Sequence, residues 1–348
     1  MLITIISFIF VFTFIALTHE IGHLIWAKRA GIRVHELALG FGPRIFSFKK
    51  NDTVYAVNLI PILGYVKIAG EGENEEDKIC PEEEKFFSKT PPQKFKALAA
   101  GPFMNILSAF ILLCLIFIFV GVPKEISNEI GAVNKNSPAE AAGLRVGDKL
   151  LAINGKAFPK MEEAITLIHK SQNKTLTLTI DRNGQKFQAK AIPKYNPKLK
   201  VALLGFSPKP IYKKVNTFLA LYYGFEQTLS MIILALMVIG QLIAGMVSVT
   251  DLAGPVGIAQ ITGKYAQSGI ISLLHFTAFI SINIGILNLL PIPALDGGHL
   301  VFVIIEWIRK KAVDPKLENK ISYWGLLFLL ALMVLVTFND ILRLFGNR

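Results

Sequence analysis

The sequence predicts a polytopic α-helical membrane protein that carries a membrane-associated β-hairpin or small sheet and one soluble α+β domain. Of its 348 residues, 52% are hydrophobic, and the mean hydropathy is +0.49. Soluble globular proteins are rarely so apolar, and several segments reach the roughly 20 residues that a helix needs to cross a bilayer. We expect about four spans, at residues 2–27, 95–120, 271–296 and 321–344.

The composition argues against two classes of protein. Cys80 and Cys114 are the only cysteines, so neither a disulfide framework nor a thiolate metal site is expected. The formal net charge of +12 is explained by basic residues that flank the spans and cover the soluble domain, next to anionic lipid. We therefore expect the lipid bilayer as a partner, and no nucleic acid.

The first span sets the orientation of the chain. Six basic residues follow it against a single acid, Glu36; they are Lys28, Arg29, Arg33, Arg44, Lys49 and Lys50. Because cytoplasmic loops carry the excess of Lys and Arg, this end of the span is predicted to face the cytoplasm. The N-terminus lacks a basic n-region and a small-residue cleavage site, so we expect the helix to be retained.

Two segments are expected to form β structure. Residues 53–69 are rich in β-branched and aromatic residues and are interrupted by Pro61 and Gly64, which predicts a hairpin or small sheet beside the first helix. Residues 122–206 contain alternating runs, and Asn183-Gly184 is a hairpin turn signal. We divide the chain into an N-terminal membrane region (1–121), a soluble domain (122–206), an interfacial or partly immersed helical region (207–269) and a C-terminal membrane region (270–348).

The pattern His19-Glu20-Ile21-Gly22-His23 stands inside the first apolar helix. Positions i and i+4 of a helix lie on one face, so both imidazoles can bind one metal ion, with Glu20 beside it as a general base. Ionisable groups at this depth are costly and mark a functional site. The pattern predicts water-splitting chemistry inside a membrane.

The second half of the site is predicted where the third span breaks, between Asn288 and Gly298. Residues 276–295 contain no charged side chain, and Asp296 follows them directly. Asp296 is either an ordinary helix cap before two glycines or a third metal ligand. Two His and one carboxylate leave a fourth position open for water, as in hydrolytic zinc sites. With the His-Glu pattern elsewhere in the chain, we favour the ligand.

The two halves meet at one depth only if the first and third spans run in the same direction. Each delivers its ligands just before a basic patch, which places them toward the cytoplasmic side. Residues 216–249 are apolar enough to span the membrane, but a single crossing there would reverse the third span. We expect this stretch to lie along the interface, partly immersed, or to form a hairpin. The soluble domain is then extracytoplasmic.

Together these residues resemble the site-2 protease family of intramembrane zinc metalloproteases, and within it the branch of bacterial regulator-of-sigma-E proteases. The family's zinc motif matches residues 19–23, and its Asn-x-x-Pro-x-Pro-x-Leu-Asp-Gly motif matches residues 288–297. Gly101-Pro102 with Asn105, and residues 254–257, match further family patterns. Residues 137–155 resemble a PDZ domain of bacterial proteases, which captures peptide ends or strands by β-augmentation.

The resemblance implies a zinc metalloendopeptidase of the bacterial inner (cytoplasmic) membrane. Its Zn2+ would be held by His19, His23 and Asp296, with Glu20 as the catalytic base. Its substrates would be single-pass membrane proteins that another protease has already trimmed, including anti-sigma factors and signal-peptide remnants.

Six residues are candidates for binding the substrate. By resemblance, Asn288 stabilises the developing oxyanion or holds an unwound substrate backbone. A helical substrate hides its carbonyl groups, and the edge of the 53–69 segment is suited to pair with it once it is unwound. The candidates are Asn288, Pro291, Pro293, Gly64, Tyr65 and Val66.

Two other functions are compatible with parts of the pattern. One is a proteolytically inactive membrane scaffold that tethers partners through the PDZ-like domain. Glu20 disfavours it, because zinc binding alone does not need that residue. The other is a metal transporter, since intramembrane His and Asp residues also mark ion paths. The polar residues cluster at one depth instead of forming a relay across the bilayer, which disfavours transport.

Overall fold

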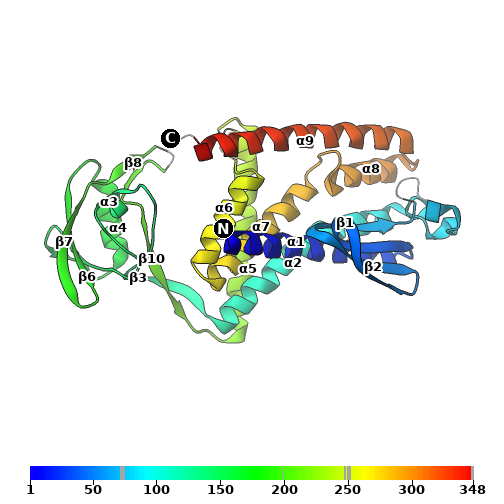
Figure 1. Cartoon of the computed structure of the whole chain (residues 1–348). Coiled ribbons are helices and arrows are strands. Elements are labelled where there is room, and N and C mark those ends of the chain that lie inside the picture. Colours follow the sequence, from blue (N-terminus) through cyan, green and yellow to red (C-terminus); the bar gives the residue numbers. More distant parts are fainter. Residues whose placement is uncertain (71–74, 198, 247, 249–251, 346–348) are drawn as a thin grey trace. The chain divides into compact units, whose positions relative to one another are not determined.

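The computed structural model describes residues 1–70, 75–197, 199–246, 248 and 252–345 (Figure 1). The chain forms two compact units, one made of Met1–Ile116 with Leu221–Arg348 and the other of Phe117–Ala220. The first unit contains most of the long apolar helices, and the second contains a six-stranded sheet.

Within these described ranges, seven helices make up most of the first unit, and two of them, α2 and α5, continue into the second unit. They are α1 (Leu2–Arg29), α2 (Pro91–Phe119), α5 (Thr217–Ile243), α6 (Pro255–Gln267), α7 (Ile270–Leu289), α8 (Asp296–Arg309) and α9 (Pro315–Phe345). Among the described residues, α1, α2, α5, α7 and the Lys316–Arg343 part of α9 are long and apolar enough to cross a bilayer. Length and composition alone therefore allow five spans where the sequence predicted about four.

Two predictions about these helices need correction. The hairpin alternative for residues 216–249 is wrong, because α5 is one continuous helix from Thr217 to Ile243. The third predicted span, 271–296, is interrupted: α7 ends at Leu289 and α8 begins at Asp296. Pro291 and Pro293 cannot continue a helix. The turn is tight, since a Cβ atom on Gly297 would clash with the carbonyl group of Leu290.

Small side chains hold the helices of the first unit close together. Ala109 of α2, Ala235 of α5 and Ala278 of α7 are all buried in one apolar cluster. At the other end of α2, the buried Lys94 places its Nζ atom 2.9 and 3.0 Å from the carboxylate oxygens of Glu306. This ion pair fixes α8, the helix that begins with Asp296, against α2.

The predicted β segment belongs to a sheet that is larger than expected. Strand β1 (Val34–Lys50) pairs with β2 (Thr53–Ile68), and residues 36–39 have partners in 54–57 on one side and in 64–67 on the other. The segment 64–68 is thereby one edge of this sheet, and the 44–50 segment, which pairs with 53–58, is the opposite edge. Three short turns, η1 (Glu75–Lys78), η2 (Glu82–Glu84) and η3 (Phe86–Ser88), lead into α2.

The second unit is built on a six-stranded sheet. Its strands are β3 (Val122–Val133), β4 (Lys149–Ile153), β5 (Lys156–Ala157), β6 (Leu176–Arg182), β7 (Gln185–Ala191) and β10 (Phe206–Lys213). Their order is β10-β3-β4-β6-β7, with β5 on β4, and β8 (Lys194–Asn196) pairs with β9 (Val201–Leu203). Asn183 and Gly184 form the β6–β7 turn with φ of 53° and 86°, as the turn signal predicts. Because β10 pairs with β3, the sheet extends past residue 206.

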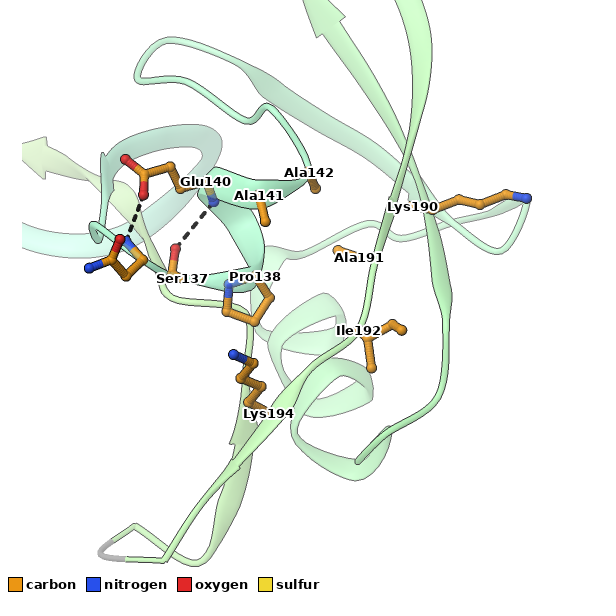
Figure 2. A pocket seen from close by; sticks show the side chains of 10 residues that line it. Ser137, Pro138, Glu140, Ala141, Ala142, Lys190, Ala191, Ile192 and Lys194 are labelled. Carbon is orange, nitrogen blue, oxygen red and sulfur yellow. Dashed lines mark hydrogen bonds between the residues drawn. The ribbon is translucent and has the colours of Figure 1, made fainter. Parts of the chain in front are cut away.

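The described residues of the second unit also form two short helices, α3 (Pro138–Ala141) and α4 (Met161–Lys170). Ile130, Leu150 and Leu178 are among the apolar side chains that fill the core between sheet and helices. Figure 2 shows a pocket of about 490 Å³ at the edge formed by β7, lined by α3 and by Lys190, Ile192 and Lys194.

The most buried charge of the second unit generates a test of its stability. Asp148 is 1% exposed and accepts hydrogen bonds from the Arg182 guanidinium at 2.7 and 2.8 Å and from the Arg145 N–H at 2.8 Å. Burial alone raises the pKa of Asp148, but these donors outweigh it and hold the pKa below its usual range. The ionised Asp148 therefore stabilises the folded second unit above about pH 4. This stabilisation is lost as the pH falls through the pKa of Asp148 in the folded state.

We therefore predict that Asp148→Asn lowers the stability of the second unit by about 1.5–3 kcal/mol at neutral pH. Hydrogen exchange of the β4 and β6 amides in the full chain measures this, and the difference from the unmodified chain should shrink in acid. Glu163→Gln, at an exposed position of α4, is the control. Equal protection in the Asp148→Asn variant at pH 7 would contradict the assignment.

Candidate metal centre

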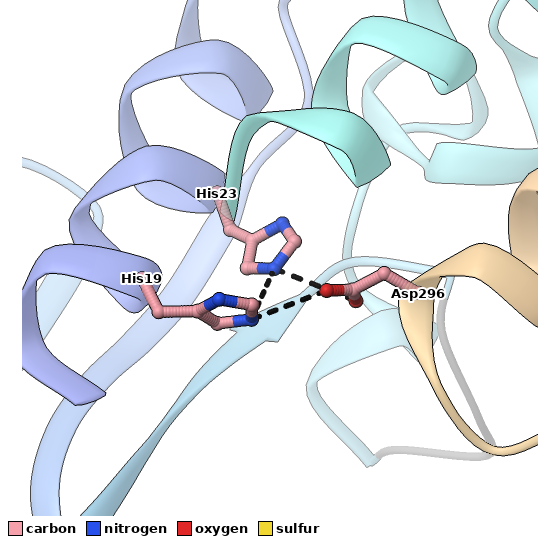
Figure 3. Close-up of side chains that lie close together, drawn as sticks. All are labelled: His19, His23 and Asp296. Atoms are coloured by element: carbon pink, nitrogen blue, oxygen red, sulfur yellow. Dashed lines mark hydrogen bonds and ion pairs between the residues drawn. The ribbon is translucent and has the colours of Figure 1, made fainter. Parts of the chain in front are cut away.

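Three side chains from two distant helices converge in the first unit (Figure 3). His19 and His23 lie one turn apart on α1, and Asp296 is the first residue of α8. Nε2 of His19 is 3.1 Å from Nε2 of His23, while the Asp296 carboxylate is 3.2 Å from His19 and 3.5 Å from His23. Among the described residues, His19, His23 and Asp296 are the one group of three or more His, Cys, Asp or Glu side chains that lie close enough together to hold one metal ion.

These separations fit a zinc ion. Ligand atoms about 2.0–2.1 Å from a tetrahedral zinc lie roughly 3.3 Å from one another. The two Nε2 atoms are 3.1 Å apart, Oδ2 of Asp296 is 3.2 Å from Nε2 of His19, and Oδ1 of Asp296 is 3.5 Å from Nε2 of His23. Oδ2 of Asp296 is buried, and no hydrogen-bond partner satisfies it among the described residues. Such an oxygen next to two imidazole nitrogens is a chemically suitable donor for a cation. Two His and one carboxylate leave the fourth position of a catalytic site open.

A backbone carbonyl orients His23. Nδ1 of this ring lies 2.9 Å from the carbonyl oxygen of Ala97, which only accepts, so the ring proton is on Nδ1 and Nε2 offers a lone pair. The carbonyl belongs to a turn of α2 that is one hydrogen bond short, because Pro102 has no N–H to donate to Leu98. No residue pattern in the sequence indicates this contact, since the acceptor is main chain.

Two glycines make room for the site where α1 crosses α2. A Cβ atom on Gly22 would clash with the carbonyl group of Ala100. A Cβ atom on Gly101 would clash with Nε2 of His23 and lie 2.8 Å from Nε2 of His19. The space in front of the two metal-facing nitrogens therefore depends on the missing side chain of Gly101. The sequence identified Gly101-Pro102 as a match to a family pattern without showing that it lies at the imidazoles.

Glu20 lies beside the same nitrogens and against the edge of the β1–β2 sheet. Its carboxylate lies near the backbone N–H of Val66, which favours the charged form. A Cβ atom on Gly64 would lie 3.2 Å from Cγ of Glu20 and 3.0 Å from the Ala38 carbonyl oxygen. The edge segment thus approaches the candidate base closely, and Gly64 permits that approach.

The other candidate substrate residues lie on β2, on α7 and in the loop between α7 and α8. Tyr65 is 41% exposed and donates its hydroxyl to Glu36 at 3.1 Å. Asn288 is on the last turn of α7, while Pro291 and Pro293 lie in the loop that leads to Asp296. The two prolines line an apolar cavity of about 650 Å³ with aromatic residues of α9. Gly325 of α9 packs directly on Pro293.

Comparison with known proteins assigns this arrangement to a family. Residues 7–332 match the profile described as Peptidase family M50. The chain is 33% identical to the zinc metalloprotease RasP of Bacillus licheniformis, covering 98% of this chain and 99% of that protein. It is also 33% identical, over 98% of this chain and 99% of the relative, to the regulator of sigma-W protease RasP of Bacillus subtilis and to the probable protease eep of Enterococcus faecalis.

A solved PDZ domain of an SdrC-like protein from Listeria monocytogenes aligns with 26% of this chain and 93% of its own, at 23% identity and a TM-score of 0.22.

The family match covers most of the chain and the relatives align over nearly their whole length. The residue pattern, the five apolar helices and the RasP relatives agree. The chain therefore belongs to peptidase family M50, the site-2 proteases, and is a zinc metalloprotease of the membrane.

Proposed function

We propose that this protease hydrolyses peptide bonds in or near the transmembrane segments of single-pass proteins that an earlier cut has shortened. The observation that carries the proposal is the convergence of His19, His23 and Asp296 beside Glu20, within helices that are otherwise apolar. One of the relatives is named a regulator of sigma-W protease. We accordingly propose anti-sigma factors and signal-peptide remnants as substrate classes.

The three converging side chains are proposed as the zinc ligands. Bound zinc with an open fourth position acidifies a water molecule and polarises a substrate carbonyl group. Glu20 takes the proton of the attacking water and later transfers it to the leaving amine. The nearby Val66 N–H is proposed to hold the Glu20 carboxylate in place for both transfers.

The substrate is proposed to bind as an added strand on the 64–68 edge. This edge approaches Glu20 through Gly64, and an open edge offers backbone groups to an unwound peptide. Apolar side chains of the substrate are suited to the cavity beside Pro291 and Pro293. Asn288, at the end of α7, is proposed to contact the substrate backbone or the oxyanion.

The orientation of the chain in the membrane is proposed from the basic residues at the ends of the helices. Lys28 and Arg29 end α1, and Arg309 ends α8, so the ligands lie toward the cytoplasmic side. In Figure 1, α5 and α6 run across the direction of α1 and α9. This supports four spans, formed by α1, α2, α7 and α9, with α5 lying obliquely or along the interface. The second unit is then extracytoplasmic.

The second unit is proposed to be PDZ-like and to capture peptide ends or strands. Its sheet ends in β10, and an end strand offers its outer edge for strand addition. Phe206 and Ser207 precede two prolines, Pro208 and Pro210, in this strand. Because proline has no N–H, we expect a bound strand to pair mainly with the first two residues.

Glu20→Gln should lower the rate of cleavage of a model transmembrane substrate by about 10²–10⁴-fold, because the amide does not accept the proton. Zinc content, measured by elemental analysis, should stay at the wild-type level. Glu83→Gln, at an exposed position away from the site, should change neither quantity. Wild-type cleavage by the Glu20→Gln variant would remove Glu20 as the base.

Gly101→Ala should weaken zinc binding by roughly tenfold or more, the scale known for changes next to metal ligands, because the new methyl group occupies the space in front of His23. Alanine is the better helix former, so a loss of zinc would not reflect a weakened helix. Gly240→Ala, where the added carbon meets open space, is the matched control. Equal zinc affinity in both variants would contradict the position of the metal.

Tyr65→Cys should form a disulfide cross-link with a substrate that carries a cysteine near its cleavage site, in the Glu20→Gln background. Phe48→Cys is the control, because it is similarly exposed, at 51% against 41%, but lies on the opposite edge of the sheet. The native cysteines are buried. Equal cross-linking from both positions would refute binding at the 64–68 edge.

A further inference from the structure

We infer that Asn105 is a positioning residue for the metal site: its side-chain amide fixes the ring proton of His19 on Nδ1 and so leaves Nε2 free for zinc. The inference rests on the ligand set proposed above. It assigns a role to a residue of α2 that lies four positions beyond Gly101 and touches neither the metal nor the substrate in that proposal.

An imidazole that binds a metal through Nε2 carries its proton on Nδ1, and this proton needs an acceptor. For His23 the acceptor is the Ala97 carbonyl oxygen. For His19 the polar group next to Nδ1 is the amide of Asn105, at 3.3 Å. Asn105 is 0% exposed, so solvent does not reach around this side chain to replace it.

The orientation of that amide decides which nitrogen of His19 holds the proton. With Nδ2 of Asn105 facing Nδ1, the amide donates, the ring proton is on Nε2, and Nε2–H faces the Asp296 carboxylate at 3.2 Å. A metal ion does not bind a protonated nitrogen. A rotation of 180° about the last side-chain bond exchanges Nδ2 and Oδ1 without changing the shape of the group. Oδ1 of Asn105 then accepts a hydrogen bond from the Nδ1–H group of His19.

Thr18 permits the rotated amide on its other side. Its hydroxyl has one proton and lies 3.0 Å from two acceptors, the Ile15 carbonyl oxygen and Oδ1 of Asn105. When the amide is rotated, the hydroxyl donates to Ile15, and the Thr18 oxygen accepts a hydrogen bond from Nδ2 of Asn105. The rotation therefore leaves no group around Thr18 unsatisfied.

The backbone of Asn105 is held in place, so the rotation changes nothing else. Its carbonyl oxygen accepts from the hydroxyl groups of Ser108 at 3.0 Å and Ser281 at 2.8 Å. Ser281 belongs to α7, the helix that leads to Asp296. The same short stretch of α2 therefore orients both imidazoles, His23 through the Ala97 carbonyl group and His19 through the Asn105 amide.

The test compares Asn105→Leu with Asn105→Asp in the purified full-length chain. The measured quantities are zinc content and the rate of zinc transfer to a fluorescent chelator. Leucine has the same number and branching of side-chain heavy atoms but no acceptor, and should weaken zinc binding by about 10–100-fold. Aspartate keeps an acceptor for the Nδ1 proton and takes the Thr18 proton, so its zinc affinity should match or exceed wild type. Thr277→Val is the control: this side chain is 0% exposed and its hydroxyl donates to the Leu273 carbonyl oxygen of its own helix, so its loss should leave zinc affinity unchanged.

If Asn105 only packed the helices together, the aspartate variant would lose more zinc than the leucine variant. Leucine suits an apolar helix contact, whereas a buried carboxylate does not. Thermal unfolding of the zinc-depleted variants checks that each is folded. Zinc retention by the Asn105→Leu variant at the wild-type level, or equal loss in the leucine and aspartate variants, would overturn the role of Asn105 alone. A wild-type chain that binds no zinc would overturn the ligand set itself, and this inference with it.

Discussion

Two imidazoles and a carboxylate have to lie within 4.8 Å of one another inside helices made of apolar side chains, and the structure of the first unit follows from this constraint. Each such group is expensive away from water unless a partner compensates it. The helices therefore approach closely enough for backbone and amide groups to serve as partners. Gly22 and Gly101 permit that approach, because a side chain on either would collide with the facing helix or with the imidazoles.

The remaining elements lie around this point and carry the residues proposed to bind a peptide. The interruption between α7 and α8 puts Asp296 at the start of a helix that the Lys94–Glu306 pair fixes against α2. The prolines that cause the interruption also form one wall of an apolar cavity. The edge of the β1–β2 sheet lies against Glu20. We propose that the base, the ligands and the strand edge together form a site suited to an extended peptide rather than to a helix.

The sequence contained the residues of the site but not the contacts that orient them. The spacing of His19 and His23 and the charge-free run before Asp296 predicted three side chains at one depth, and the structure brings them together, while their role as ligands stays a prediction. The Ala97 carbonyl and Val66 N–H contacts are main-chain interactions that no residue type announces. Hydrophobicity did not separate α5 from the proposed spans, because a helix packed across its neighbours is as apolar as one that crosses the bilayer. The pairing of residues 36–39 with two different segments was also missed, since a short strand pattern does not reveal its partners.

Zinc-edge X-ray absorption spectroscopy of the purified full-length chain tests the ligand set most directly. The account predicts two imidazole ligands and oxygen donors at about 2.0–2.1 Å, with no sulfur, and a changed oxygen shell with reduced zinc content in Asp296→Asn. A spectrum with a single imidazole, or one that is identical in the Asp296→Asn variant at equal zinc content, would contradict it.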